Sequence, residues 1–206
     1  MRVLELFSGT GSVGKVCKEK DWEVISLDLK NADINCNILD WDYTVYPPGH
    51  FDIIWASPPC DTFSILRRSW IGRKLKVFGD NIVTAEMLDN DMEENGLPIL
   101  NRTIEIIDYF NPKFYFIENP KTGKMKNYIK LPFYDVDYCR YGLEYKKSTR
   151  IWTNSTTFIP RLCNCVGKHK ETIGGHGTKT CKNISQLNLK YRIPTQLINE
   201  LFESII

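Results

Sequence analysis

A cysteine placed directly after two prolines suits the chemistry of a nucleophile. Residues 51–56 form an apolar run whose composition and length predict a buried parallel strand. Pro58 and Pro59 then end this strand and stiffen the turn, because proline fixes φ and has no amide hydrogen. We therefore expect the thiol of Cys60 just beyond the carboxyl end of the strand, where open α/β sheets bind their ligands. A turn with an incidental buried cysteine is the alternative, since free cysteines are often buried.

A carboxylate and an amide follow a second predicted strand. Residues 113–117 are rich in apolar side chains, and Glu118 and Asn119 come directly after them. If this strand and strand 51–56 are both parallel and central, the two side chains lie at the same sheet edge as Cys60. Glu118 could then hydrogen-bond a ring nitrogen and an exocyclic amine of a nucleobase. A glutamate that faces solvent is the alternative.

A glycine-rich turn at residues 8–14 is predicted between a strand at residues 3–7 and a helix at residues 15–20. Glycines allow positive φ and a close approach of a ligand to the backbone. Asp28 follows at the end of the next predicted strand, about 20 residues after the glycines, where a carboxylate can bind ribose hydroxyls. A tight connection without a ligand and a capping or solvated aspartate are the alternatives.

An acidic residue next to an aromatic one follows a third predicted strand at residues 35–39. Asp40 could bind the amino group of an adenine, and Trp41 could stack on its ring. An ordinary surface turn is the alternative.

Basic residues surround Trp70 in residues 66–76, directly after the candidate nucleophile. Phosphates attract lysine and arginine, and aromatic rings stack on exposed bases. The segment therefore predicts contact with nucleic acid, and a solvated basic loop is the alternative. The candidate DNA-binding residues are Arg67, Arg68, Arg73 and Lys74 here, with Lys168 and His169 in a later irregular segment.

The whole chain predicts one α/β domain, with a mainly parallel twisted sheet and helices on both faces. Its 206 residues, 42% of them hydrophobic, are enough for a sizeable core, and the net charge of +2 does not identify a partner. The other expected elements are a helical stretch at 82–110 interrupted near 95–98, an antiparallel pair at 133–138 and 149–153, and a final amphipathic helix at 193–202.

The cysteines bear on both compartment and metal binding. Seven cysteines, no signal peptide and no apolar stretch of the ~20 residues that span a bilayer predict an intracellular protein without membrane contact. A Cys-x-Cys pair is tighter than the Cys-x₂₋₄-Cys spacing usual at zinc sites, so we predict no bound metal, and a structural zinc site of three thiolates and an imidazole is the alternative. The residues that this prediction leaves as free side chains are Cys163, Cys165, His169, His176 and Cys181.

Several motifs, in order along the chain, resemble those of the cytosine-carbon-5 DNA methyltransferases. Residues 5–11 are similar to the family's first motif, Asp-Leu-Phe-x-Gly-x-Gly, with Glu in place of Asp. Residues 59–64 are similar to its Pro-Cys-Gln-x-Phe-Ser nucleophile motif, and residues 118–120 resemble its Glu-Asn-Val motif. Residues 149–152 resemble the second half of its Gln-x-Arg-x-Arg motif, and residues 191–194 a shortened final motif.

The resemblance implies a Rossmann-like class I methyltransferase fold, S-adenosylmethionine as cofactor and DNA, rather than RNA, as substrate. It implies methyl transfer to carbon 5 of a flipped cytosine through a covalent Cys60 adduct, with Glu118 on ring nitrogen 3. Asn119 and Arg150 complete the implied catalytic set. The implied cofactor contacts are Phe7, Ser8, Gly9, Thr10, Gly11, Asp28, Asp40, Trp41 and Pro58.

The sequence also departs from the family pattern. Ser148 stands where the first Arg of the Gln-x-Arg-x-Arg motif is expected, and about thirty irregular residues replace a target-recognition domain. We interpret residues 154–190 as a reduced target-recognition or DNA-facing segment, and expect action in the cytoplasm of a prokaryote or a virus-infected host cell. The alternatives are an RNA cytosine-5 methyltransferase, an exocyclic amino-methyltransferase of DNA and an inactive nucleic-acid-binding relic.

Overall fold

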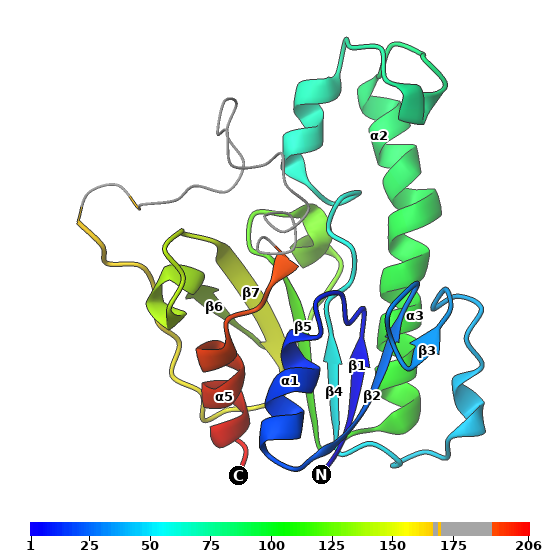
Figure 1. The fold of residues 1–206 in the computed structure, drawn as a ribbon. Coiled ribbons are helices and arrows are strands. Elements are labelled where there is room, and N and C mark those ends of the chain that lie inside the picture. Colours follow the sequence, from blue (N-terminus) through cyan, green and yellow to red (C-terminus); the bar gives the residue numbers. More distant parts are fainter. Residues whose placement is uncertain (167–168, 170–190) are drawn as a thin grey trace.

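A seven-stranded sheet forms the centre of the computed structural model, which describes residues 1–166, 169 and 191–206 (Figure 1). Its strand order is β3-β2-β1-β4-β5-β7-β6. The first five strands in this order run parallel, whereas β7 is antiparallel to both β5 and β6. The strands are β1 Arg2–Leu6, β2 Glu23–Asp28, β3 Ile34–Asn35, β4 Ile53–Ala56, β5 Phe114–Pro120, β6 Phe133–Asp137 and β7 Ser148–Thr153.

The sequence predicts that strand 3–7 is central and lies next to strand 51–56, and the pairing of β1 with β4 confirms this. Val3 lies opposite Ile53 and Leu6 opposite Ala56, and Ala56 in turn lies opposite Ile117 of β5. The predicted antiparallel pair is also present, as β6 and β7. Because parallel strands end at one edge of a sheet, the segments that follow β1, β2, β4 and β5 converge there.

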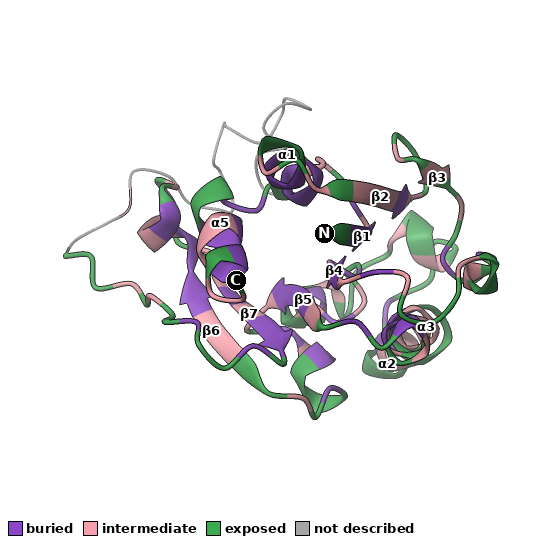
Figure 2. Cartoon of the chain, turned by 90° about the horizontal axis from the view of Figure 1, so that it is seen from below, coloured by how far each residue is buried: buried purple, intermediate pink, exposed green. Residues whose placement is uncertain are grey.

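Helices cover both faces of the sheet, as predicted. Figure 2 shows α1 and α5 on one side of the strands and α2 and α3 on the other. The amphipathic α5 agrees with the predicted final helix. The helices are α1 Ser12–Glu19, α2 Ala85–Asp91, α3 Leu97–Phe110 and α5 Thr195–Glu203.

Strand β4 is buried on both faces. All four of its side chains are 0% exposed. Ile53 and Trp55 pack with residues of α1 and α5, whereas Ile54 and Ala56 pack with residues of α3. Successive side chains of a strand point to opposite faces, so a strand covered on both sides must be apolar throughout.

The interruption predicted near residues 95–98 is a single wide helical turn, Met92–Gly96, that joins α2 to α3. Pro98 in the first turn of α3 has no amide hydrogen to donate, which favours such a local change of helical geometry. Gly96 has a packing role, because a Cβ there would lie 3.1 Å from the ring of Phe63 and collide with Thr62. The absence of a side chain at Gly96 therefore lets the helix approach the loop that follows Cys60.

Two predicted boundaries differ from the structure. Strand β3 is shorter than residues 35–39, because Asn37 binds the amide of Leu39 and forms a local turn in place of the ladder. At the other end of the chain, Ser155 and Phe158 are buried, so the start of segment 154–190 belongs to the core. Most of that segment lies outside the described residues.

No helix in the described part of the chain is long and apolar enough to cross a membrane.

Candidate active site

The glycine-rich turn between β1 and α1 has a left-handed backbone. Phe7, Gly9 and Gly11 have φ values of 60°, 50° and 64°. Phe7 is held in this conformation by a 2.8 Å hydrogen bond from its amide to the carbonyl of Leu27 in β2. A non-glycine residue at positive φ is strained, and such strain is concentrated at functional sites. The turn leaves open space around Gly11, where no atom lies within 4 Å of an added Cβ.

Glu5, on β1, holds the end of this turn through hydrogen bonds to the start of α1. Its carboxylate accepts hydrogen bonds from the amides of Val13 (3.2 Å) and Gly14 (2.9 Å), which are donors in the first turn of α1. The side chain is buried, and this burial raises the pKa of Glu5 to about 7 despite the two hydrogen bonds, which lower it. The acidic residue of the first motif thus caps a helix.

Asp28 ends β2 beside the turn. Its Oδ2 accepts from the amide of Gly9 at 2.8 Å and its Oδ1 from the amide of Leu29 at 2.6 Å. The residue is half-buried, and a carboxylate with two such bonds keeps further acceptor capacity for hydroxyl groups. The structure therefore brings Asp28 to the glycine-rich turn, as the sequence predicts.

The other predicted cofactor residues differ in their exposure. Asp40 is exposed, but Trp41 is 7% exposed and packs in the core, so little of its side chain is available for stacking. Ser8 and Pro58 are buried. Thr10 contacts Ser12 through their hydroxyl groups at 2.9 Å. The contact between Trp41 and an adenine therefore stays a prediction. The surface that Trp41 exposes for it is smaller than we expected from the sequence.

Cys60 and the Glu118-Asn119 pair lie at the same sheet edge, since β4 and β5 are parallel neighbours. The side-chain amide of Asn119 donates a 2.8 Å hydrogen bond to the carbonyl of Pro58. This buried bond fastens the nucleophile loop to the end of β5. The Oδ1 of Asn119 is also buried and has no hydrogen-bond partner among the described residues.

Glu118 is held by two side chains that the sequence did not single out. Its Oε1 accepts from the Tyr138 hydroxyl at 2.8 Å and lies 3.4 Å from the ammonium group of Lys147. Burial raises the pKa of Tyr138 well above its usual value, so the phenol stays protonated and donates. Both residues lie in the connection between β6 and β7. They reach Glu118 on β5 because of the order of the strands in the sheet, not because of their spacing in the sequence.

The charges around Cys60 oppose one another. Burial raises the pKa of its thiol, the nearby carboxylate of Glu118 raises it further, and the ammonium group of Lys147 lowers it. The net shift is upward, so the thiol form dominates at neutral pH. The thiolate is the reactive form, which makes Lys147 the cation that favours it.

Arg150 pairs with Asn119 in the strand register, so it lies on the same face of the sheet as Asn119 and on the opposite face from Glu118. The guanidinium of Arg150 binds both carboxylate oxygens of Asp135, at 2.8 and 3.1 Å, and lies over the ring of Phe133. The predicted catalytic role of Arg150 has no support in these contacts, and Lys147 is the cation beside Glu118.

The basic segment forms an arm, residues 65–84, that rises beyond the carboxyl ends of the parallel strands (Figure 1). Arg67 points inward, is 7% exposed and forms an ion pair with Asp91 at the end of α2. Its guanidinium also lies over Trp70, 5.1 Å from the ring centre. Arg67 therefore holds the arm together, which corrects its assignment to DNA.

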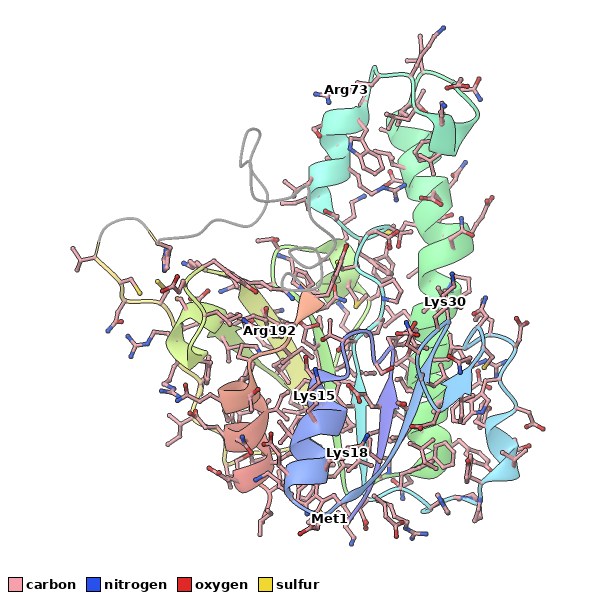
Figure 3. All side chains as sticks on the ribbon, viewed as in Figure 1. Met1, Lys15, Lys18, Lys30, Arg73 and Arg192 are labelled. Atoms are coloured by element: carbon pink, nitrogen blue, oxygen red, sulfur yellow. The ribbon has the colours of Figure 1, made fainter. Side chains whose placement is uncertain are left out.

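Arg68, Arg73 and Lys74 are exposed on the arm, with Arg73 at its tip (Figure 3). The other predicted DNA contacts lie in the segment after β7. Lys168 lies outside the described residues, and the Nε2 of His169 is 3.5 Å from the sulfur of Cys163. Three of the six predicted DNA-binding residues are thus on the arm and accessible.

Comparisons with known proteins agree with these observations. No protein-family model matches the chain. A "Probable DNA (cytosine-5)-methyltransferase" of Frog virus 3 (isolate Goorha) is 40% identical over 220 residues, which cover 98% of this chain and 99% of that protein.

One solved structure shares the fold, and a second matches less closely. A "putative DNA modification methyltransferase" encoded within an E. coli prophage matches with a TM-score of 0.50 and 13% identity, over 78% of this chain and 51% of that one. The S. pombe Dnmt2 methyltransferase matches with a TM-score of 0.48 and 14% identity, over 74% of this chain and 50% of that one. The chain thus spans about half the length of these two proteins.

Proposed function

This chain belongs to the DNA (cytosine-5)-methyltransferase family, and on that premise we propose that it methylates carbon 5 of a flipped-out cytosine through a covalent bond to Cys60. The observation that carries the proposal is the meeting of Cys60 with Glu118 at one sheet edge, beside the ammonium group of Lys147. This arrangement combines a nucleophile, an acid and a cation that favours the thiolate.

The nucleophilic step follows from the chemistry of cytosine, whose carbon 5 is a poor nucleophile. Attack of the Cys60 thiolate on carbon 6 forms an S–C bond and makes carbon 5 an enamine carbon. The electron pair displaced in the ring gathers at nitrogen 3, where the proton that the Cys60 thiol has given up to Glu118 neutralises it. After methylation, loss of the carbon-5 proton to solvent, cleavage of the S–C bond and return of the nitrogen-3 proton to Glu118 restore the ring, the thiolate and the acid.

Tyr138 and Asn119 act as positioning residues in this scheme. Tyr138 fixes the Oε1 of Glu118 and leaves its other oxygen for the base. Asn119 fixes the loop of Cys60 through the carbonyl of Pro58, and its unpartnered Oδ1 offers an acceptor in the same buried region. A misplacement of about an ångström would slow such a reaction strongly, so these restraints matter for rate.

S-adenosylmethionine, when bound, supplies an electrophilic methyl group on a sulfonium. The residues present fit this group, because the left-handed turn leaves open space at Gly11 and Asp28 retains acceptor capacity beside Gly9. Asp28 would bind the ribose hydroxyls, and the exposed Asp40 would bind the adenine amino group. Phe7 and Ser8 would supply the backbone of the cradle.

DNA binding is proposed for the arm. Arg68, Arg73 and Lys74 can contact phosphates, while Leu66 and Val77 expose 70% and 74% of their surfaces beside them. A basic arm with apolar side chains, placed above the catalytic edge, suits a duplex from which one base has been extruded.

The proposal is tested by incubating the protein with unmethylated duplex DNA, or with transfer RNA, and S-adenosylmethionine carrying a labelled methyl group. Hydrolysis and mass spectrometry should find the label in 5-methylcytosine from DNA. Label in N4-methylcytosine or N6-methyladenine would overturn the role of Cys60, and label in RNA alone would overturn the substrate. The absence of any transfer would favour the inactive relic.

A further inference from the structure

Three thiols and an imidazole meet in a cluster that the methyl-transfer site does not use. Cys139 lies in the short helical turn Tyr138–Tyr141 after β6, and Cys163, Cys165 and His169 lie in the segment after β7. One ligand atom from each of these four residues lies within 4.8 Å of the other three. We propose that these four residues form a structural zinc site, which we call the Cys3His cluster.

The distances suit a tetrahedral ion. Zinc bonds of about 2.3 Å to sulfur and about 2.0–2.1 Å to nitrogen place neighbouring ligand atoms about 3.6–3.8 Å apart. The sulfur of Cys163 and the Nε2 of His169 are 3.5 Å apart. No two of the four ligand atoms are more than 4.8 Å apart, so binding of the ion requires a contraction of at most about an ångström.

The donor set selects the metal. Three sulfurs and one imidazole nitrogen are ligands that zinc prefers, whereas calcium and magnesium prefer oxygen. A set of four protein ligands leaves no position for substrate, which is the pattern of structural rather than catalytic zinc. A disulfide would use two of the sulfurs, and it would not explain why the third sulfur and His169 lie close to them.

The scaffold around the cluster brings the two segments together without help from the sulfurs. The amide of Cys163 donates to the Oδ2 of Asp137 at 2.8 Å, and the amide of Asp137 donates to the carbonyl of Arg161 at 3.2 Å. The side chains of Arg140 and Asn164 are also hydrogen-bonded. The ligands are therefore preorganised, and Arg140 supplies positive charge next to a site where three thiolates and Zn²⁺ sum to one negative charge.

Sequence spacing concealed this site because Cys139 comes from a different element. Cys163 and Cys165 alone form a pair that is too tight, but with Cys139 and His169 they complete a tetrahedral set. His176 and Cys181, the other candidates from the sequence, lie outside the described residues. The proposal replaces our prediction of no metal, and it makes His169 a ligand rather than a DNA contact.

The site has a consequence for the catalytic edge. Cys139 directly follows Tyr138, whose hydroxyl holds Glu118. A zinc ion would thus tie the segment after β7 to the turn that positions the catalytic acid. Its presence does not depend on the methyl-transfer proposal, because metal content can be measured without activity.

The experiment measures zinc in the full chain, purified under reducing conditions without a His tag. Elemental analysis should find about one zinc per chain in the wild type and less than about a tenth of that in the double variant Cys139→Ser/Cys163→Ser. Cys36→Ser, which changes a half-buried thiol packed against the core, is the matched control and should keep its zinc.

Cobalt(II) exchanged into the wild type keeps the test decisive if the double variant fails to fold. Tetrahedral thiolate ligation should give thiolate-to-cobalt charge-transfer and visible absorption bands, and His169→Ala should change these bands whereas His176→Ala should not. Wild-type protein that holds less than about a tenth of an equivalent of zinc per chain, even after incubation with zinc, would overturn the proposal. Zinc loss in Cys181→Ser or His176→Ala, but not in His169→Ala, would also overturn this ligand set.

Discussion

Two groups of cysteines in this molecule are assembled in different ways. Cys60 is a single thiol at the end of β4, and a buried strand and two prolines in the same short stretch place it there. Cys139, Cys163 and Cys165 come from two segments that only the tertiary structure joins. Local sequence can therefore reveal a nucleophile mounted on one strand, whereas a ligand set shared between segments needs the fold.

Their surroundings also differ in a way that suits different chemistry. Cys60 lies beside a carboxylate and a lysine, and the pKa of its thiol is raised by burial and by Glu118. The Cys3His cluster gathers three sulfurs with an imidazole, an arrangement in which thiolates need a cation.

The largest expected effect separates these two groups directly. Cys60→Ser should lower methyl transfer at least about a thousandfold, because a hydroxyl is far less nucleophilic than a thiolate. S-adenosylmethionine binding and thermal stability should stay near their wild-type values. Steady-state assays and calorimetry check this, and near-normal turnover would show that the thiol is not the nucleophile.

The same contrast explains what could be predicted from the sequence. The glycine-rich turn, Asp28 and Cys60 depend on local strand–turn geometry, so their positions were predicted correctly. The meeting of Cys60 with Glu118 followed because parallel central strands share one edge. These features need only the strand order that an α/β fold imposes.

The residues that were missed or misplaced depend on sheet pairing and side-chain direction. Tyr138 and Lys147 reach Glu118 only because β7 lies between β5 and β6. Arg150 was placed in the site by its motif, but its guanidinium binds Asp135, which lies opposite it on the neighbouring strand β6. Arg67 looked like a phosphate contact, yet its partner Asp91 lies on α2, far along the chain.

The next largest effect is expected for Glu5, a residue whose contacts come from the adjacent turn and helix, and it concerns the dependence of stability on pH. Its pKa rises from 4.5 to about 7 on folding, so the native state holds the proton more tightly than the unfolded state. Its contribution to stability is fully present below pH 4.5 and is lost as the pH rises through about 7, with a limit of about 3 kcal/mol. Denaturant unfolding should show this loss in the wild type.

Glu5→Gln is the matched variant, since it does not titrate and keeps one of the two oxygens that accept from the amides of Val13 and Gly14. In this variant, the free energy of unfolding should lack most of the decline that the wild type shows between pH 4.5 and 7. Parallel pH profiles for the two proteins would show that Glu5 has an ordinary pKa in the folded state.

Asp28→Ala tests whether the glycine-rich turn is a cofactor site. It should weaken S-adenosylmethionine binding by about 1–3 kcal/mol, the usual cost of losing a hydrogen bond to a charged group. Asp33→Ala is a suitable control, because Asp33 also accepts hydrogen bonds near β2 but from Ser26. Calorimetry that gives equal affinities for the wild type and Asp28→Ala would remove Asp28 from the site.

Lys147→Gln should have the smallest effect and tests the electrostatics of Cys60. Loss of the ammonium group raises the pKa of the thiol further, so the rising limb of the pH–rate profile should move to higher pH. Turnover at neutral pH should fall about tenfold, which corresponds to ~1.4 kcal/mol. Lys146→Gln, an exposed neighbour, should leave the profile in place, and an unshifted profile for Lys147→Gln would refute the role of this charge.

The central claim is that Cys60 forms a covalent bond to carbon 6 of the target cytosine. DNA that contains 5-fluorocytosine tests it directly, because the fluorine cannot leave as the carbon-5 proton does and the adduct is trapped. With S-adenosylmethionine, the wild type and Cys36→Ser should form a protein–DNA complex that survives denaturation, and Cys60→Ser should form none. A wild type that methylates DNA but gives no such complex, or a complex with Cys60→Ser, would contradict the account.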